Sequence, residues 1–492
     1  MLTKSDFLKY IQCPKYLWLQ KHRKDLIPEE VDKNLQKIFD NGYLVESYAY
    51  DLFPEGVNAQ LDDFQKSITE SKKLLEKNTS TIFQATIATN ELFCRSDIVK
   101  FNKSDNSWDI YEVKSATEVK DINFYDLAFQ KICFESLNYK VNKTYIIFVN
   151  NEYVRKGEIE PKKLLKIEDV SESVKLLEDE VKIKIKKALD IIKQKDEVNV
   201  RILKQCEDPY TCIFTQYCWK DIPNNSIYNI AGGLKEKTLN QLLDEGILEI
   251  KDIPEGVITS ARGLRHYNVV KQNKVHIELE NIQKELSQLQ YPLYFIDYET
   301  NSPAVPLFDG YKPYQRMIFQ YSLHIQKQPQ GPVEHYAYLA KKWEDPSLGL
   351  AEDLKKRVGK VGSFISWNMV FENGCNNEMA ERYPQYACFF EDINNRMFDL
   401  MQIFKKGYYV HKDFQGSASI KKVLPVLVPE LSYSDLSIQE GTTASNKWRV
   451  MIDSETDKKE SEEIYNNLLE YCKLDTLAMV EILNRLYKEL NK

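Results

Sequence analysis

Residues 94–115, CRSDIVKFNKSDNSWDIYEVKS, predict two strands joined by the polar turn NKSDNS. Asp97 lies in the first strand, and the pattern E-x-K places Glu112 and Lys114 in the second. Because side chains alternate along a strand, Glu112 and Lys114 face the same side of the sheet. Asp97 and Glu112 would bind a divalent ion such as Mg²⁺, which prefers oxygen ligands. Lys114 would orient or deprotonate an attacking water, or stabilise charge on a phosphate.

The pattern of Asp97, Glu112 and Lys114 also has an ordinary interpretation, a salt bridge at the surface of a Lys/Glu-rich chain. Two further residues favour a site. Glu46 lies upstream in a helix-like stretch and would supply another carboxylate, and Gln130 lies in a predicted helix that follows the E-x-K strand. We therefore expect Glu46, Asp97 and Glu112 as metal ligands, with Lys114 and Gln130 in catalysis.

Nine cysteines are unevenly distributed along the chain. Cys206, Cys212 and Cys218 form a cluster with five residues between successive thiols, and Cys13 stands alone near the start. Zinc knuckles place two to four residues between cysteines, whereas iron–sulfur clusters accept more varied spacing. These four predict a metal site, and the alternative is four unrelated thiols. The other five are expected in the core: Cys94, Cys133, Cys375, Cys388 and Cys472.

A second group of acidic residues lies in the C-terminal part of the chain. The apolar stretch YFIDYET (294–300) ends with Asp297 and Glu299, and EYCKLDTLAM (470–479) places Tyr471 and Asp475 on one helix face. Between them, FISWNMVFENGC (364–375) resembles the middle motif of 3′–5′ exonucleases, with Glu372 in the usual Asp position. Four such carboxylates would hold two divalent ions roughly 4 Å apart, with Tyr471 positioning the attacking water.

Length and composition predict a multidomain α/β protein. A chain of 492 residues exceeds one ordinary core. Its net charge of −7 argues against nucleic-acid binding over the whole surface, although a local basic channel is compatible with it. Apolar runs are strand-sized, shorter than a membrane span, and the first residues lack the apolar core of a signal peptide. We therefore expect a cytoplasmic protein without membrane association.

Residues 1–222 resemble the RecB-like branch of the PD-(D/E)xK nucleases, including CRISPR-associated and AddB-type members. The resemblance rests on the order of Glu46, Asp97, Glu112, Lys114 and Gln130. It implies a restriction-endonuclease-like core, and many relatives have His where Glu46 stands. It also implies a [4Fe–4S] cluster, because these relatives often carry one early and three late cysteines, here Cys13 and Cys206, Cys212 and Cys218.

Residues 291–487 resemble the RNase H-like DEDD exonucleases with Tyr in the last motif. They resemble more closely an uncharacterised domain family fused behind RecB-like nucleases, sharing PLYFIDYET, PYQ…FQYS, FDL at Asp399, SIKKVLP at Lys421 and YCKLDTLAM. Glu372 departs from the Asp of the exonuclease pattern. Asp399 and Lys421 are either accessory site residues or an internal ion pair. The expected domains are 1–222, a helical connector at 223–288, and 289–492.

These observations predict a Mg²⁺- or Mn²⁺-dependent DNA nuclease, an exonuclease or end-processing enzyme acting on single strands or ends in repair, recombination or defence. One alternative is a ribonuclease acting through the C-terminal domain, because carboxylate–metal chemistry does not distinguish the sugar. Another is a nucleic-acid-binding scaffold whose nuclease sites are degenerate.

Overall fold

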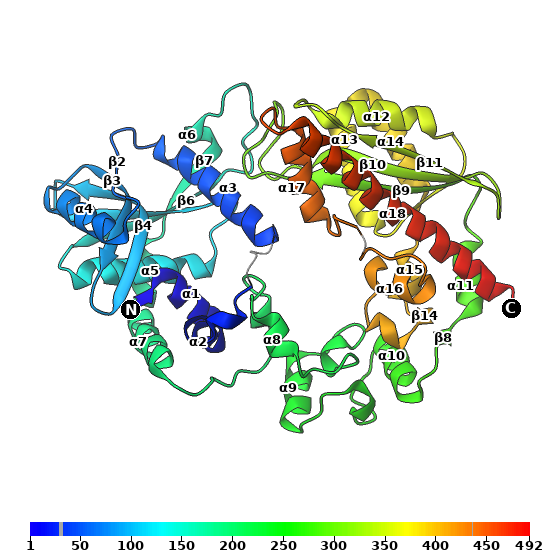
Figure 1. Cartoon of the computed structure of the whole chain (residues 1–492), viewed down its shortest axis with the longest axis horizontal. Coiled ribbons are helices and arrows are strands. Elements are labelled where there is room, and N and C mark those ends of the chain that lie inside the picture. The colour runs from blue at the N-terminus through cyan, green and yellow to red at the C-terminus, as the bar shows by residue number, and fades with distance from the viewer. Residues whose placement is uncertain (29–32, 435) are drawn as a thin grey trace. The chain divides into compact units, whose positions relative to one another are not determined.

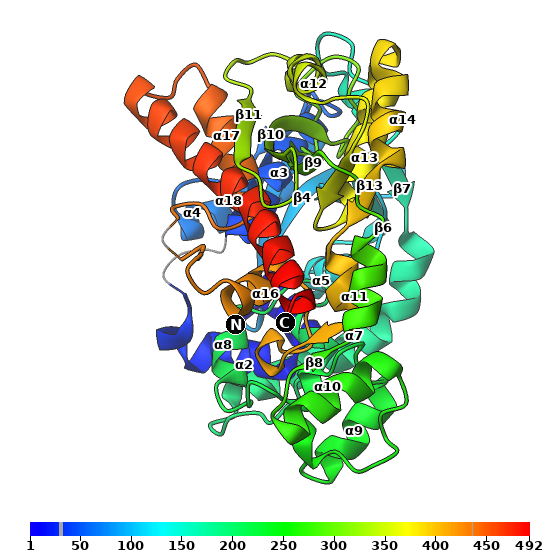
Figure 2. The same ribbon diagram turned by 90° about the vertical axis from the view of Figure 1, so that its right-hand side faces the viewer.

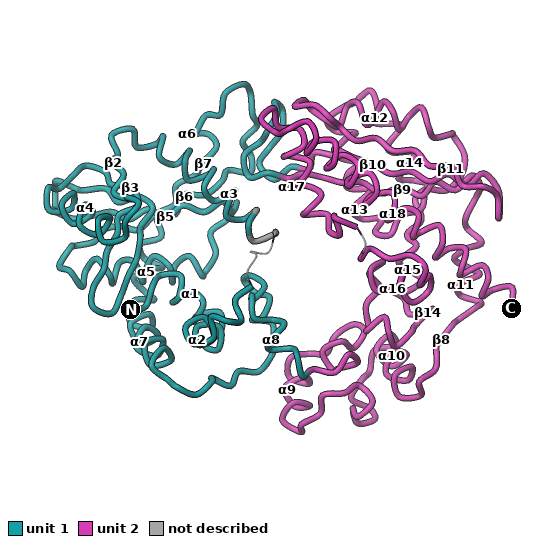
Figure 3. Tube along the Cα trace, in the orientation of Figure 1, with its two compact units in different colours: residues 1–221, 303–315 teal, residues 222–302, 316–492 magenta. Residues whose placement is uncertain are grey.

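The computed structural model describes residues 1–28, 33–434 and 436–492, and the chain divides into two compact units. The first unit comprises residues 1–221 together with 303–315, and the second comprises 222–302 and 316–492 (Figures 1 and 3). The expected multidomain α/β architecture is confirmed at this level. The finer assignments, to a restriction-endonuclease-like core and an RNase H-like domain, stay predictions, as do the exact domain boundaries.

Within the described residues, the first unit contains a seven-stranded mixed sheet of order β2-β3-β4-β5-β6-β7, with β1 paired to β4. The strands are β1 (Leu2–Thr3), β2 (Val57–Asn58), β3 (Thr81–Ala88), β4 (Leu92–Asn102), β5 (Ser107–Lys114), β6 (Val141–Val149) and β7 (Leu165–Asp169). The predicted pair of strands is confirmed, because β4 and β5 are antiparallel and register Ile98 with Tyr111 and Asn102 with Ser107. Asn106 takes a left-handed φ of 51° in the polar turn.

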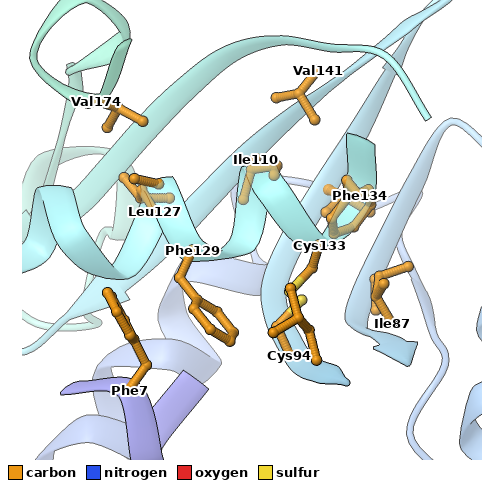
Figure 4. Close-up of a cluster of buried hydrophobic side chains, with 14 of the residues drawn as sticks. Phe7, Ile87, Cys94, Ile110, Leu127, Phe129, Cys133, Phe134, Val141 and Val174 are labelled. Carbon is orange, nitrogen blue, oxygen red and sulfur yellow. The ribbon is translucent and has the colours of Figure 1, made fainter. Parts of the chain in front are cut away.

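Two apolar layers cover this sheet. On one face, α5 (Asp121–Ser136), α7 (Ser171–Lys193) and α1 (Lys4–Gln12) form a core in which Phe7, Cys94, Phe129 and Cys133 are fully buried (Figure 4). On the other, α3 (Lys33–Tyr50) packs through Val45 and Ala49. The remaining helices of this unit are α2 (Pro14–His22), α4 (Phe64–Glu76), α6 (Pro161–Leu164) and α8 (Thr215–Trp219).

Residues 303–315 belong to the first unit although they connect two strands of the second. Ala304 and Val305 are buried in the same apolar cluster as the α3 side chains. The Arg155 guanidinium donates hydrogen bonds to the carbonyls of Pro306 and Leu307, at 2.9 and 2.7 Å. This segment is therefore held both by apolar burial and by half-buried hydrogen bonds from the Arg155 side chain to its backbone.

The second unit is built on a five-stranded sheet of order β11-β10-β9-β12-β13, counted over the described residues. Its strands are β9 (Leu293–Asn301), β10 (Met317–Gln326), β11 (Val333–Leu339), β12 (Ser363–Ser366) and β13 (Met397–Asp399). The pairs β9–β10 and β10–β11 are antiparallel, whereas β9–β12 and β12–β13 are parallel. The central strand β9 therefore has both of its edges paired.

Alternation along β9 separates an apolar face from a polar one. Tyr294, Ile296 and Tyr298 pack in the core with α12 (Pro346–Arg357), α13 (Met369–Arg382) and α14 (Ala387–Asn395). The opposite face lies against the long helix α18 (Lys458–Leu490), which runs beside α17 (Gly441–Ile452) (Figure 2). The residues at odd positions, Asp297 and Glu299, face this side.

The rest of the second unit is helical apart from a short ribbon of β8 (His276–Ile277) and β14 (Tyr409–Val410). Residues 222–288 contribute α9 (Glu236–Asp244), α10 (Ala261–Gln272) and α11 (Leu279–Leu286), and α15 (Met401–Lys405) and α16 (Ile420–Leu427) follow later. Ile227, Leu242 and Ile250 form a small core of their own. No helix in the described part of the chain combines the length and apolarity needed to cross a bilayer.

Replacing Phe129 with Ala is expected to lower the free energy of unfolding of the first unit by about 3–5 kcal/mol, because it leaves a cavity in a close-packed core. Phe129 is fully buried and its ring lies 5.0 Å from that of Phe7. Urea denaturation followed by circular dichroism measures the change. Leu176→Ala on α7, where the side chain is 84% exposed, is the matched control with an expected change within about 0.5 kcal/mol. Equal losses in the two variants would contradict this core.

Candidate functional site

The E-x-K strand and helix α5 bring three of the predicted residues into direct contact. Lys114 Nζ lies 2.7 Å from Glu112 Oε1. The Gln130 side chain donates through Nε2 to Glu112 Oε2 at 2.6 Å. Its Oε1 atom accepts a hydrogen bond of 2.6 Å from Ser96 Oγ. Asp97 on β4 accepts a 2.7 Å hydrogen bond from the backbone N–H of Val113, which fixes its carboxylate beside the E-x-K strand.

Two charged residues of this site were not predicted from the sequence. Asp126 on α5 is fully buried and lies 2.8 Å from Lys114 Nζ, and it accepts a 2.9 Å hydrogen bond from Gln130. Lys4, at the start of α1, contacts both oxygens of Glu112 at 2.9 and 3.0 Å. The spacing D-x-x-x-Q places Asp126 and Gln130 on one helix face and is a usable signal. Lys4 had no such signal.

The charges of this first site balance only in part. Burial, together with the neighbouring Asp126 and Asp97, raises the pKa of Glu112 to about 7. Burial would raise the pKa of Asp126 too, but the ammonium groups of Lys114 and Lys4 hold it below its usual range. Burial acts to lower the pKa of Lys114, yet Asp126 and Glu112 raise it above its ordinary value. Lys114 is therefore cationic at neutral pH, which favours stabilising charge on a substrate over removing a proton.

Glu46 lies at the margin of this group. Its carboxylate accepts hydrogen bonds from Tyr50 and from Gln84, whose backbone takes a left-handed φ of 53°. Burial raises the pKa of Glu46 most, and the charge of Glu112 raises it further. Glu46 is thus within electrostatic reach of Glu112, but its hydrogen bonds go to Tyr50 and Gln84. Non-glycine residues at positive φ cluster at functional sites, and Gln84 lies beside the half-buried carboxylate of Glu46.

The four outlying cysteines lie together in the first unit. Cys13 lies at the junction of α1 and α2, Cys206 and Cys212 lie on the turn before α8, and Cys218 lies in α8. All four line one cavity, together with apolar side chains such as Tyr16 and Leu19. Burial, followed by the other thiols, raises the pKa of Cys212 to about 12, so a bound metal would be needed to hold it as a thiolate.

The spacing of the four sulfurs distinguishes two kinds of metal. A zinc ion with Zn–S bonds of about 2.3 Å holds tetrahedral sulfurs about 3.8 Å apart. Among the described residues, no three of these sulfurs lie within 4.8 Å of one another. The four sulfurs are therefore not spaced as the ligands of one zinc ion.

In the second unit, strand β9 and helix α18 bring together the predicted carboxylates. Ligand atoms of Asp297, Glu299 and Cys472 all lie within 4.8 Å of one another. Cys472 Sγ is 3.5 Å from Asp297 Oδ2, so this cysteine, expected as ordinary core, adjoins the site. Asp475 accepts a 2.6 Å hydrogen bond from Tyr433, another residue not predicted from the sequence.

Glu372 and Tyr471 complete this second group. Glu372, on α13, is buried, and its Oε2 atom has no hydrogen-bond partner. Tyr471 on α18 is buried beside Asp475, whose pKa its hydrogen bond lowers. A buried carboxylate oxygen without a partner is costly, and a bound cation would satisfy it.

Burial and mutual repulsion raise the pKa values of the whole second group. Burial raises the pKa of Asp297 well above its ordinary value, and Asp475 and Glu299 raise it further. Burial also raises the pKa of Glu372 to about 8 and that of Asp475 to about 6. These carboxylates must either take up protons or share a cation. A site that gathers like charges in this way is a functional candidate.

Asp399 and Lys421 do not form the ion pair that was one of their two expected roles. Asp399 accepts a 2.8 Å hydrogen bond from Gln402, and Lys421 Nζ donates to the carbonyl of Gln439 at 2.6 Å. Burial raises the pKa values of Glu299 and Asp475, and the charge of Lys421 opposes this rise, so Lys421 acts on the second group from nearby. Among the remaining cysteines expected in the core, Cys94, Cys133 and Cys375 are buried, but Cys388 is exposed because it lies on the outer face of α14.

Comparisons with known proteins identify similarity to uncharacterised sequences. Residues 294–419 match the family described as "Domain of unknown function (DUF2779)". The chain is 26% identical over 237 residues to the "Uncharacterized protein MG366 homolog" of Mycoplasma pneumoniae, covering 44% of this chain and 35% of that protein. It is 24% identical over 295 residues to the "Uncharacterized protein MG366" of Mycoplasma genitalium, covering 52% and 43%. The aligned regions therefore span less than half of these relatives.

In the presence of EDTA, the free energy of unfolding of the second unit is expected to fall as the pH rises from about 4.3 to about 8. The folded-state pKa of Glu372 is about 8, above the ~4.3 of an unfolded glutamate. The folded protein therefore holds a proton that the unfolded chain releases, and stability present below about pH 4.3 is lost progressively up to about pH 8. The contribution is at most about 1.4 kcal/mol per pH unit for this group.

Urea denaturation at each pH measures this slope, and Glu372→Gln is the matched variant. The amide keeps the shape of the side chain and does not titrate, so the slope should become shallower in this variant. Identical slopes in wild type and Glu372→Gln would exclude Glu372 as the titrating group.

Proposed function

We propose that this protein is a metal-dependent nuclease that hydrolyses DNA phosphodiesters, with one site in each unit. The observation that carries the proposal is the geometry of the first site. Asp97 and Glu112 lie on paired strands, and Lys114 contacts Glu112 while being held by buried Asp126. Two hard anionic ligands and a fixed cation form the set that phosphodiester hydrolysis requires. DNA as the substrate, and a role in end processing, repair or defence, follow from the resemblance of residues 1–222.

In the first site, the chain's own residues orient the reactants. Asp97 and Glu112 would hold Mg²⁺ or Mn²⁺, which lowers the pKa of a bound water and polarises the phosphate. Lys114, cationic because Asp126 lies beside it, would stabilise the charge that develops on the phosphate oxygens. Gln130 fixes Glu112 through its amide, and Ser96 in turn fixes Gln130. Glu46 is positioned to join this group as a further carboxylate.

In the second site, Asp297, Glu299, Glu372 and Asp475 would hold one or two divalent ions of the same kind. Their raised pKa values and the unpartnered oxygen of Glu372 support a cation at this position. Tyr471, buried beside Asp475, would orient an attacking water. Cys472 differs from the carboxylates as a soft donor within ligand distance of Asp297 and Glu299.

The four-cysteine cavity would hold an iron–sulfur cluster, which the resemblance identifies as [4Fe–4S]. The sulfurs line one cavity, and they stand farther apart than a single zinc ion would hold them. Cys13 and Cys218 lie at opposite ends of the first 221 residues. A cluster that joins them would restrict the unfolded chain as a cross-link does, so the role proposed for it is structural.

Cleavage of end-labelled DNA with Mn²⁺ is expected to depend on Lys114 and on Asp297. Lys114→Ala should slow cleavage by the first site by about a hundredfold or more, because a fixed cation is lost where negative charge develops. Asp297→Ala tests the second site, and the double variant should be inactive. Lys103→Ala, in the exposed turn between β4 and β5, is the matched lysine control and should cleave at the wild-type rate.

Single- and double-stranded DNA and RNA are compared in the same assay. Loss of RNA cleavage alone in Asp297→Ala would support a ribonuclease acting through the second unit. An unchanged rate of cleavage in Lys114→Ala would contradict the assignment of catalysis to the first site. Metal and nucleic-acid binding without cleavage of any substrate would support a scaffold instead.

Protein purified without oxygen is expected to be brown and to contain about four iron atoms per chain. Cys212→Ala should lose most of the iron and the visible absorbance, because one of four ligands is removed. Cys388→Ala, on the exposed face of α14, is the matched control and should retain both. A colourless preparation with zinc and no iron would exclude the cluster. Elemental analysis and absorption spectroscopy provide the measurements.

A further inference from the structure

Lys4 occupies the coordination position of Glu112. Its Nζ contacts both carboxylate oxygens of Glu112, at 2.9 and 3.0 Å, and lies 3.6 Å from Asp126 Oδ1. The side chain of Lys4 is 18% exposed and that of Glu112 is 4% exposed. A cation that bridges the two oxygens of a buried carboxylate occupies the space in which a divalent ion would bind the same oxygens.

Several contacts fix the backbone that carries Lys4. Leu2 and Thr3 form strand β1, which pairs with β4, the strand that carries Asp97. Thr3 caps α1 in a capping box with Asp6. This reciprocal pairing of side chain and backbone sets the first turn of the helix, where Lys4 lies.

Further contacts hold the rest of α1 in place. Asp6 is held by Lys21 at 2.5 Å, and Phe7 stacks on Phe129 of α5 at 5.0 Å. Helix α5 also carries Asp126 and Gln130. The contact of Lys4 with Glu112 is thus built into the fold by the same elements that form the site.

The two lysines of the site share the same two carboxylate partners, Glu112 and Asp126, but at different distances. Lys114 is shared between Glu112 and Asp126 at 2.7 and 2.8 Å, so it stays anchored to Asp126 if Glu112 takes another cation. Lys4 Nζ lies at hydrogen-bond distance from Glu112, 2.9 Å, whereas its ion pair with Asp126 is longer, 3.6 Å. Since two cations and a divalent ion cannot all share one carboxylate without strong repulsion, Lys4 is the group that must give way.

We propose that Lys4 is an internal counter-cation that holds the metal position on Glu112 until a divalent ion displaces it. This inference rests on the proposed metal site of the first unit and adds an exchange of cations to it. The ammonium group offsets the burial of Glu112 in the metal-free protein, and it sets the affinity of the site by competing for the same oxygens. No bond is made or broken; one ion pair is replaced by another.

Mn²⁺ titration by electron paramagnetic resonance tests the exchange. The protein carries Asp297→Ala, so that the ion measured binds in the first unit. Lys4→Met, which keeps much of the apolar stem, is expected to bind Mn²⁺ on the order of tenfold more tightly, because the competing charge is gone. Lys4→Arg keeps the charge and should bind as the Asp297→Ala protein does. Lys66→Met on the exposed face of α4 is the matched control for loss of one lysine and should also leave the affinity unchanged.

Equal or weaker Mn²⁺ binding by Lys4→Met would overturn the inference. Lys4→Gln provides a second neutral variant, and circular dichroism shows that each variant is folded. Glu112→Gln separates the two proposals. If this variant binds Mn²⁺ as tightly as the Asp297→Ala protein, both the metal site of the first unit and the exchange of cations are contradicted. If Lys4→Met binds more tightly but no substrate is cleaved, the exchange stands and the nuclease proposal falls.

Discussion

The burial of like-charged carboxylates is the constraint around which both units are organised. An isolated carboxylate loses several kcal/mol of hydration when it leaves water, and a second one nearby adds repulsion. The two units meet this cost differently. In the first, Lys4 and Lys114 neutralise Glu112 and Asp126 in the folded chain itself. In the second, Asp297 and Glu299 lie on one face of β9 beside Cys472 of α18, and no lysine contacts them among the described ion pairs.

The protonation of the two groups has a functional consequence. In the first site, Lys114 and Lys4 hold the pKa of Asp126 below its usual range, whereas burial raises the pKa of Glu112 to about 7, so Glu112 is partly protonated at neutral pH. The second site, which has no lysine contacts among the described ion pairs, also holds protons, as the raised pKa values of Asp297 and Glu372 indicate. Metal binding there releases protons, so its affinity rises with pH.

The sheet architecture explains how each group is gathered. In the first unit, the β4–β5 hairpin sets Asp97 beside the E-x-K strand, and α5 packs across it to supply Asp126 and Gln130. In the second, β9 alternates between a core face and a polar face, and α18 lies along the polar face. The strands determine where the carboxylates lie, and a helix on the same face encloses them. Residues 303–315 extend from β9 and complete the core of the first unit, so the two units share continuous chain.

The sequence by itself determined the local elements and most of the residues that the structure gathers in the two groups. The alternation in 94–115 specified two strands with Glu112 and Lys114 on one face, and D-x-E at 297–299 specified a pair of carboxylates, because side-chain direction in a strand follows from position alone. The cysteine spacing singled out four thiols that line one cavity. Only the tertiary structure decided which distant charges complete these groups. Lys4 reaches Glu112 across 108 positions and Cys472 adjoins Asp297 across 175, and no local periodicity encodes such contacts. These contacts form when α1 and α18 pack against the sheets. Packing removes water from between the charged groups, and their attraction or repulsion then becomes strong.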